Sequence, residues 1–291
     1  MTSLVMIDGR PMAPEAAKVS VFDRGFLYGD SVFETLRTYG GRLFALDRHL
    51  ARLARSAARV FIELPVSTAQ LGREVESAVV GAGNPESYVR LTLTRGVGDG
   101  LGLDPGLARH PLRVVIVTPL QAPAAAAYAE GVAVVTYRGA RVTDDSSASG
   151  AKVGNYLTAV LASREMRAAG AAEALILDRR GCVVEGATSN VFAVRADGTL
   201  VTPPEQDGIL LGITRETLLE VAGELGLQVE LRSLTLPELM SAAEVFVCSS
   251  IRELLPVVSV DGQPIGSGRP GPVTQRLLLA FREKCNKNKR L

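Results

Sequence analysis

The stretch Pro119-Leu-Gln-Ala-Pro-Ala-Ala-Ala-Ala127 divides the sequence into two parts. Its sudden change to alanine and proline, without helix or strand signals, is typical of an interdomain linker. We therefore predict a small N-terminal domain over residues 1–120, a linker over residues 121–130 and a larger C-terminal domain over residues 131–291. A chain of 291 residues is long enough for two domains that each bury a core.

Upstream of the linker, the sequence mixes helix and strand patterns. Apolar residues three and four positions apart predict helices, and runs rich in β-branched residues predict strands. The expected helices cover residues 47–61, with Asp47 as the N-terminal cap, and 68–80. The expected strands cover residues 4–8, 19–22, 88–94 and 112–118.

Downstream of the linker, short strands at hairpin spacing outnumber strand-helix-strand units. The expected strands cover residues 132–137, 174–177, 183–185, 191–194, 200–202, 228–231, 244–248 and 257–260. A polar loop is expected over residues 143–150. The expected helices cover residues 155–169, 214–224 and 273–284. The fold class predicted for the whole chain is α+β.

The composition argues for a globular protein and against several classes of function. Hydrophobic residues make up 47% of the sequence, and 32 basic side chains face 31 acidic ones. This balance leaves no basic surplus for binding nucleic-acid phosphates. No apolar run approaches the roughly 20 residues of a membrane span, and the first residues lack a signal-peptide pattern, so we expect a cytoplasmic protein.

Cysteine and histidine are scarce, which disfavours disulfide and metal chemistry. Cys182, Cys248 and Cys285 form no Cys-x-x-Cys pair. The two histidines, His49 and His110, belong to no cluster at the spacing of metal ligands. We therefore expect reduced thiols and no metal site.

Lysine is almost absent from the middle of the sequence. Of the 32 basic residues only five are lysine, and Lys152 is the only one between Lys18 and Lys284. Arginine serves as well as lysine for solubility, but only lysine offers an amine that can lose its proton and form a Schiff base with a carbonyl. Lys152 is therefore the first candidate for catalysis, with an accidental surface lysine as the alternative.

Glu185 and a glycine-bounded turn are the next candidates. Glu185 lies at the end of an apolar strand, where it can keep the ring nitrogen of a pyridinium cofactor protonated while an amine holds the aldehyde. The turn Gly208–Arg215 runs into a helix, so its backbone N–H groups and the Thr214 hydroxyl can bind a phosphate. Ser249 and Ser250 offer further hydroxyls at a strand end. A surface carboxylate and a plain helix cap are the structural alternatives.

A series of short stretches follows one order along the chain. They are Arg24–Arg37 (RGFLYGDSVFETLR), His49–Leu53, Tyr88–Arg90, Thr94–Gly96, Lys152–Leu157 (KVGNYL), Glu185–Phe192 (EGATSNVF), Gly208–Arg215 and Ala243–Phe246. Together they resemble the fold-type IV, or class IV, pyridoxal-phosphate aminotransferases. This family includes branched-chain aminotransferase, D-amino-acid aminotransferase and 4-amino-4-deoxychorismate lyase.

The resemblance implies a fold and a reaction. The implied fold is a smaller N-terminal α/β domain and a larger C-terminal, mixed β-barrel-like domain with helices, in which the Schiff-base lysine lies. The implied cofactor is pyridoxal 5'-phosphate, and the implied assembly is a homodimer. The implied reaction is ping-pong transamination between an amino acid and a 2-oxo acid, with the lyase reaction, which releases pyruvate, as the alternative.

The resemblance also assigns roles to single residues. It implies that Lys152 forms the Schiff base and moves the Cα proton, that Glu185 pairs with the pyridine nitrogen, and that Tyr156 lies near the phenolic oxygen. The residues implied to hold the phosphate are Arg52, Gly212, Ile213, Thr214, Ser249 and Ser250. The residues implied to bind substrate are Tyr28, Phe33, Arg37, Tyr88, Arg90 and Ile251.

The motifs leave the amino donor open. The pair Tyr88-x-Arg90 resembles the branched-chain enzymes, which accept an apolar side chain. Those enzymes usually carry an acidic residue at the position of Ser189 and a glycine at that of Thr35, whereas Ser189-Asn190 is closer to the D-amino-acid and lyase pattern. The Arg-x-His clamp frequent in D-specific enzymes does not follow Gly96.

Overall fold

The computed structural model of the chain describes residues 2–138 and 148–287. Contacts between residues group the described chain into two compact units, one made of residues 2–121 with 148–155 and the other of residues 122–138 with 156–287. Lys152 therefore belongs to the first unit, although its place beyond the linker led us to assign it to the C-terminal domain. Residues 143–147 of the expected polar loop lie outside the described residues, and residues 148–150 form a turn.

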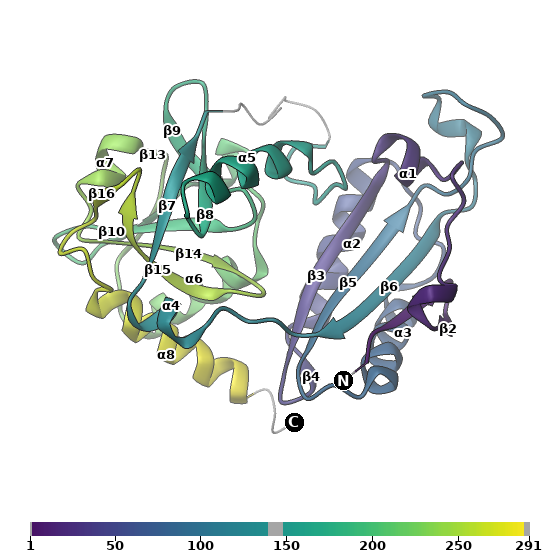
Figure 1. Ribbon diagram of the computed structural model, residues 1–291, viewed down its shortest axis with the longest axis horizontal. Coiled ribbons are helices and arrows are strands. Elements are labelled where there is room, and N and C mark those ends of the chain that lie inside the picture. The colour runs from purple at the N-terminus through teal and green to yellow at the C-terminus, as the bar shows by residue number, and fades with distance from the viewer. Residues whose placement is uncertain (1, 139–147, 288–291) are drawn as a thin grey trace. The chain divides into compact units, whose positions relative to one another are not determined.

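The first unit is built on a six-stranded antiparallel sheet with the strand order β2-β1-β6-β5-β3-β4. Its strands are β1 (Leu4–Ile7), β2 (Arg10–Met12), β3 (Ser31–Tyr39), β4 (Arg42–Leu43), β5 (Ser87–Thr94) and β6 (Leu112–Pro119). Its helices are α1 (Arg24–Tyr28), α2 (Leu46–Arg59) and α3 (Thr68–Ala82), with 3-10 turns at Pro14–Ala16 and Pro105–Leu107. Helices α2 and α3 cover one face of this sheet (Figure 1).

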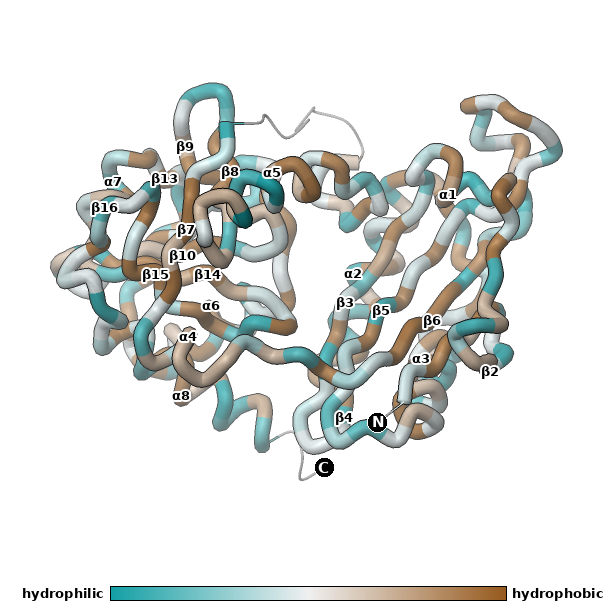
Figure 2. The backbone as a smooth tube through the Cα atoms, viewed as in Figure 1, coloured by the Kyte–Doolittle hydropathy of each residue, from teal (hydrophilic) through white to brown (hydrophobic). Residues whose placement is uncertain are grey.

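Alternation along β3 decides which side chains enter the core of this unit. Val32 and Leu36 face α2 and α3 and pack into one cluster with Leu53 and Val75. Figure 2 shows apolar stretches of β6, whose Val115 and Val117 belong to the same cluster. The opposite face of β3 carries the odd-numbered residues from Phe33 to Tyr39, which leaves that face for other contacts.

Three local expectations differ from the structure of this unit. Residues 19–22 form no strand, because these apolar side chains are exposed and have no strand to pair with; β1 pairs with β2 instead. Asp47 is not the cap of α2: the N-cap is Ala45, and Asp47 lies in the first turn, where its charge favours the positive helix end. Strand β3 was not expected at all.

The second unit contains a ten-stranded mixed sheet that forms a half-barrel. Its strands are β7 (Val132–Tyr137), β8 (Glu173–Leu177), β9 (Cys182–Gly186), β10 (Asn190–Val194), β11 (Leu200–Thr202), β12 (Val229–Leu231), β13 (Leu234–Thr235), β14 (Glu244–Ser249), β15 (Glu253–Val260) and β16 (Gln263–Pro264). Strand β7 pairs in parallel with β8 and β15, and β11 with β12, whereas the other pairs are antiparallel.

Helices surround the sheet of the second unit. They are α4 (Ala125–Ala129), α5 (Leu157–Ala168), α6 (Ile213–Glu224), α7 (Leu236–Met240) and α8 (Pro272–Lys287), with a 3-10 turn at Glu205–Asp207. Helix α4 lies inside the expected linker, where the alanine run has a high helix propensity. The expected mixed α+β class, with helices and strands in both parts, is confirmed.

The core of the second unit holds all three thiols of the chain. Phe192 stacks on Phe246 with the ring centroids 4.9 Å apart. Cys182, Cys248 and Cys285 are buried and form no disulfide. Burial raises the pKa of Cys248 to about 12, so its thiol stays protonated at neutral pH.

Membrane spans and metal clusters are both absent from the described residues. None of the described helices has the length and hydropathy to cross a bilayer. In the same part of the chain, no group of three or more His, Cys, Asp or Glu side chains is placed to hold a metal ion.

Gly96 and Gly83 differ in how much the fold of the first unit depends on them. Both have a positive φ, but an added Cβ at Gly96 would overlap the carbonyl oxygen of His110, whereas at Gly83 it would meet open space. We expect Gly83→Ala to cost about 1 kcal/mol of unfolding free energy from backbone strain alone. Gly96→Ala should cost at least about 2 kcal/mol, because overpacking adds to the strain. Equal urea midpoints for the two variants would contradict this steric explanation.

Candidate active site

The backbone around Lys152 is fastened to β3 and α2 within the first unit. The Phe33 N–H donates to the carbonyl oxygen of Lys152 at 3.0 Å, and the Lys152 N–H donates to Ser56 Oγ at 3.1 Å. The Gly154 N–H donates to the carbonyl oxygen of Ser31 at 2.7 Å, and Val153 pairs with Val32 as an isolated antiparallel bridge. Lys152 is therefore held at both its amide and its carbonyl.

The side chain of Lys152 lies against the aromatic ring of Phe33. Its Nζ is 4.6 Å from the Phe33 ring centroid, and the guanidinium carbon of Arg90 is 3.8 Å from the same centroid. Strand register pairs Thr35 with Arg90 and Arg37 with Tyr88, so Phe33, Arg37, Tyr88 and Arg90 share one face of β3 and β5. The structure therefore places four of the predicted substrate residues on one sheet face, with Lys152 against Phe33 on that face.

The opposite face of β3 carries a buried ionic cluster that the sequence did not reveal. Glu34 is fully buried, and its two oxygens accept from Arg52 Nε at 2.8 Å and Arg52 Nη2 at 2.6 Å. His49 Nδ1 lies 2.7 Å from Glu34 Oε2. Burial alone would raise the pKa of Glu34, but the charge and hydrogen bonds of Arg52, aided by His49, lower it to about 2. Arg52, predicted to hold phosphate, is thus fixed by a carboxylate.

His49 is neutral in this cluster. Burial lowers its pKa, and the positive charges of Arg52 and Lys152 lower it further, which outweighs the opposite effect of Glu34. Because an ionised carboxylate only accepts hydrogen bonds, we assign the proton to Nδ1, which then donates to Glu34.

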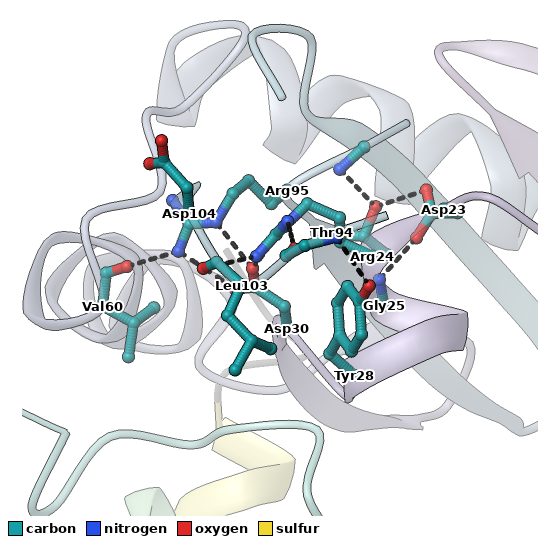
Figure 3. A network of polar contacts seen from close by, with 12 residues as sticks. Asp23, Arg24, Gly25, Tyr28, Asp30, Val60, Thr94, Arg95, Leu103 and Asp104 are labelled. Carbon is teal, nitrogen blue, oxygen red and sulfur yellow. Dashed lines mark hydrogen bonds and ion pairs between the residues drawn. The ribbon is translucent and has the colours of Figure 1, made fainter. Parts of the chain in front are cut away.

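Tyr28 belongs to a second polar network in the first unit, shown in Figure 3. Its hydroxyl accepts from the Gly102 N–H at 3.1 Å, and its ring lies under the guanidinium of Arg24. Arg24 and Arg95 both bind Asp30, at 3.0 and 2.7 Å. Arg24 also donates to the carbonyl oxygen of Gly102 at 2.7 Å. The contacts of Tyr28 therefore fasten the loop after β5, and they are separate from the face of Phe33.

In the second unit, Glu185 is held in a fixed orientation at the end of β9. Its side chain is buried, and its Oε2 accepts from the Leu210 N–H at 3.1 Å. Asn190 Nδ2 donates to the Leu210 carbonyl oxygen at 2.8 Å and approaches Glu185 Oε2 at 3.4 Å. The orientation of the Glu185 carboxylate is thus fixed by the Leu210 amide and by Asn190, the first residue of β10.

The start of α6 has the features of an anion site. Gly212 is the N-cap and supplies no capping side chain, and Ile213 and Thr214 begin the helix. A Cβ at residue 212 would overlap the Asn190 side-chain oxygen, so this close approach requires glycine. Backbone N–H groups and the positive helix end favour a phosphate here. Arg215 is not part of this site, because its buried guanidinium donates to the Pro203 carbonyl oxygen at 2.8 Å.

The remaining predicted cofactor residues lie at element ends of the second unit. Ser249 ends β14, and Ser250 and Ile251 form the turn into β15. Asn190 pairs with Cys248 in the ladder of β10 and β14, so this turn begins two residues beyond the partner of Asn190. Tyr156 is the N-cap of α5 and is half-buried.

The buried carboxylates Glu34 and Glu173 were not predicted from the sequence. Glu34 stands inside the motif that contains Phe33 and Arg37, and His49 and Arg52 share one helix face by their three-residue spacing. Two cationic or polar side chains on a buried helix face require an acidic partner. This requirement could have predicted that a carboxylate such as Glu34 lies opposite His49 and Arg52. No such signal exists for Glu173 and Arg252, which pair across 79 residues of sequence.

Comparison with known proteins points to one family. Residues 31–260 match the family model described as amino-transferase class IV. A putative branched-chain-amino-acid aminotransferase of Methanocaldococcus jannaschii is 37% identical over 96% of this chain and 95% of its own length. The D-alanine aminotransferase of Bacillus licheniformis is 36% identical over 95% of each chain. A crystal structure of the T.th. branched-chain amino acid aminotransferase with pyridoxamine 5'-phosphate has a TM-score of 0.93 at 32% identity, covering 100% of this chain and 96% of that one.

The buried Glu34 predicts a specific loss of stability in acid. A folded-state pKa of about 2 against an ordinary value of 4.5 means that the ionised carboxylate stabilises the fold above pH 4.5. This contribution, about 3 kcal/mol, is lost as the pH falls from 4.5 through 2. Glu34→Gln cannot titrate, so its deficit in unfolding free energy relative to wild type should shrink across that window.

Urea unfolding at a series of pH values measures this deficit. Glu76→Gln, at an exposed position on α3, is the matched control for loss of a carboxylate in the same unit. A Glu34→Gln deficit that stays constant from pH 6 to pH 2.5 would show that the ion pair with Arg52 does not set the pKa of Glu34.

Proposed function

The chain belongs to the class IV aminotransferases, and we propose that it moves the amino group of an apolar amino acid to a 2-oxo acid by a ping-pong reaction. The observation that carries this proposal is the placement of Lys152 Nζ against Phe33, on the sheet face that Arg37, Tyr88 and Arg90 share. Class IV aminotransferases use pyridoxal 5'-phosphate, whose protonated ring accepts the electron pair left at the substrate Cα.

Lys152 is proposed as the catalytic residue. Its amine would hold the cofactor aldehyde at rest, and once free it would act as the base that takes the Cα proton and as the acid that returns it. The hydrogen bonds at its amide and carbonyl support this role, because they fix the base of a flexible side chain and restrict the region that Nζ can reach.

Glu185 is proposed to keep the ring nitrogen protonated. The N–H of Leu210 and the side chain of Asn190 hold this carboxylate in one orientation, as a partner for a single N–H donor requires. Tyr156 is proposed to lie near the phenolic oxygen of the cofactor.

Phosphate binding is proposed for two sets of residues. Arg52 supplies a permanent positive charge whose guanidinium is oriented by Glu34. Gly212, Ile213 and Thr214 supply the backbone and the hydroxyl at the start of α6. Ser249 and Ser250 add hydroxyls from the turn after β14.

The amino-acid substrate is proposed to have an apolar side chain. Tyr88 offers partly exposed aromatic surface beside the buried ring of Phe33, whereas Arg37 and Arg90 on the same face can bind a carboxylate. Ile251 is proposed to add a further apolar contact to the substrate. Tyr28 is also proposed to contact the substrate, from the network in which its hydroxyl binds the Gly102 N–H of the loop after β5. The relatives in M. jannaschii and B. licheniformis are named for branched-chain and D-alanine substrates, so the chirality of the donor is an outcome of the test below.

A homodimer is proposed from exposed apolar side chains of the first unit, and a cytoplasmic location is proposed from the sequence. The first unit exposes large apolar side chains on its first segment and on the loop after β5, including Phe22, Phe26, Leu101 and Leu103. Arg24 joins these two segments through the Leu103 carbonyl oxygen. Contiguous apolar surface of this kind marks protein interfaces, which supports association with a second copy. The cytoplasmic location remains a prediction from the sequence.

Replacement of Lys152 tests the proposed reaction. We expect Lys152→Ala to lower turnover by at least about 10²–10⁴-fold, because the covalent anchor and the proton carrier are both lost. The visible absorption band of the loaded enzyme, and its bleaching by borohydride, should disappear as well. Lys18→Ala, at an exposed position of the same unit, is the control and should leave both unchanged. Near wild-type turnover in Lys152→Ala would refute the proposal.

A donor screen tests the substrate class. L-leucine, D-alanine and (R)-1-phenylethylamine are each offered with 2-oxoglutarate or pyruvate as acceptor. We expect L-leucine to have the highest kcat/KM, because its large apolar side chain suits the partly exposed ring of Tyr88 while the arginines bind the carboxylate. A preference for D-alanine would instead indicate a small donor of the D series and contradict the expected apolar substrate. Release of pyruvate from aminodeoxychorismate without any oxo acid would instead indicate the lyase reaction.

A further inference from the structure

The second unit contains a buried carboxylate that the proposed reaction does not use. The Glu173 side chain, at the start of β8, is only 2% exposed. Its Oε1 accepts from the Ala174 N–H at 2.9 Å. Its Oε2 accepts from Thr188 Oγ1 at 3.0 Å and from Ser189 Oγ at 2.8 Å. These neutral donors satisfy the oxygens, but they leave a buried negative charge without a counter-charge.

Arg252 supplies that counter-charge. Its Nη1 lies 2.5 Å from Glu173 Oε2 and donates also to Thr188 Oγ1 at 2.7 Å. Within residues 2–138 and 148–287, it is the only cation in an ion pair with Glu173. The Arg252 side chain is 24% exposed, so the pair is screened from water on the Glu173 side and reaches solvent on the other.

The pair connects two turns of the proposed cofactor site. Thr188 and Ser189 lie in the turn between Glu185, which lies near the end of β9, and Asn190, which begins β10 and orients Glu185. This turn is tight, because the Gly186 N–H donates to the Ser189 carbonyl oxygen at 2.7 Å and a Cβ at residue 186 would overlap the Ser189 hydroxyl.

The other turn is the one that Arg252 closes. It contains Ser249, Ser250 and Ile251, and the Arg252 N–H donates to Ser249 Oγ at 3.4 Å. The Arg252 carbonyl oxygen accepts from the Tyr128 hydroxyl at 3.1 Å. The backbone of Arg252 is therefore anchored at the end of this turn while its side chain reaches the turn that follows Glu185.

We propose that Arg252 is a positioning residue that locks these two turns together through Glu173 and thereby slows the release of the cofactor. This inference rests on the proposed function, since it assumes that Glu185, Ser249 and Ser250 contact the cofactor. Arg252 contacts no reacting atom; it acts through the orientation of the turns. Lysine can partly replace it, because one cationic nitrogen serves both Glu173 and Thr188.

The test measures how fast pyridoxal 5'-phosphate leaves the loaded enzyme. Arg252→Met keeps the length of the stem but removes the charge, and we expect release to accelerate about tenfold, as for the loss of one charge-assisted hydrogen bond. Turnover at saturating cofactor should change less than about twofold. Arg252→Lys should restore most of the slow release. The control Arg195→Met removes an arginine whose ion pairs with Asp197 and Glu230 are exposed, and it should release cofactor at the wild-type rate.

Thermal midpoints separate positioning from a merely structural role. A structural role would lower the midpoints of the cofactor-free and loaded proteins equally. The proposal expects the gap between the two midpoints to narrow in Arg252→Met, because weaker binding stabilises the loaded protein less. If Arg252→Met does not fold, Thr188→Val removes one of the links while leaving the ion pair, and should accelerate release about two- to threefold.

Two outcomes would overturn the inference. One is wild-type release from Arg252→Met, or from Thr188→Val where that variant is used. The other is an equal fall of both midpoints with an unchanged gap. Neither result touches the proposed function, which instead fails if the wild-type protein shows no absorption band that borohydride bleaches.

Discussion

A carboxylate with no exposed surface, Glu34, is the constraint on which the first unit depends. A buried charge of this kind is tolerated only with good partners, and Arg52 and His49 on α2 supply them. A helix docked in another register would leave this carboxylate without its partners. Strand β4 pairs only with the last two residues of β3, so the backbone groups of the first residues of β3 are open to the segment of Lys152. The position of the proposed catalytic lysine follows from these two arrangements.

The parts of the fold that follow a simple period could be predicted from the sequence. Helices α2, α3, α6 and α8 lie within a few residues of their expected ranges, because one apolar stripe decides where such a helix begins and ends. Strand β3 was missed because Glu34 and Arg37 interrupt its apolar pattern, and the burial of Glu34 becomes acceptable only through its partners Arg52 and His49 on α2. Residues 19–22 show the reverse error, since an apolar run without a pairing strand stays exposed.

The site could be predicted as a set of residues but not as an arrangement. Phe33, Arg37, Tyr88 and Arg90 share a face, as alternation along paired strands requires. Nothing in the order of the sequence places Lys152 beside Ser56, which lies 96 residues earlier, or Glu173 beside Arg252. Such contacts depend on which chain segments meet in the folded state. The domain of Lys152 was assigned from its place after the linker, whereas its contacts lie with β3 and α2.

The confinement of every sulfhydryl to one half of the molecule has a practical consequence. Cys182, Cys248 and Cys285 all lie in the second unit, and all are buried. A small alkylating reagent can reach them only when that unit opens locally, because a thiol must be exposed and ionised to react. The rate at which the thiols are alkylated therefore reports the opening equilibrium of the second unit. Unfolding that is confined to the first unit leaves this rate unchanged.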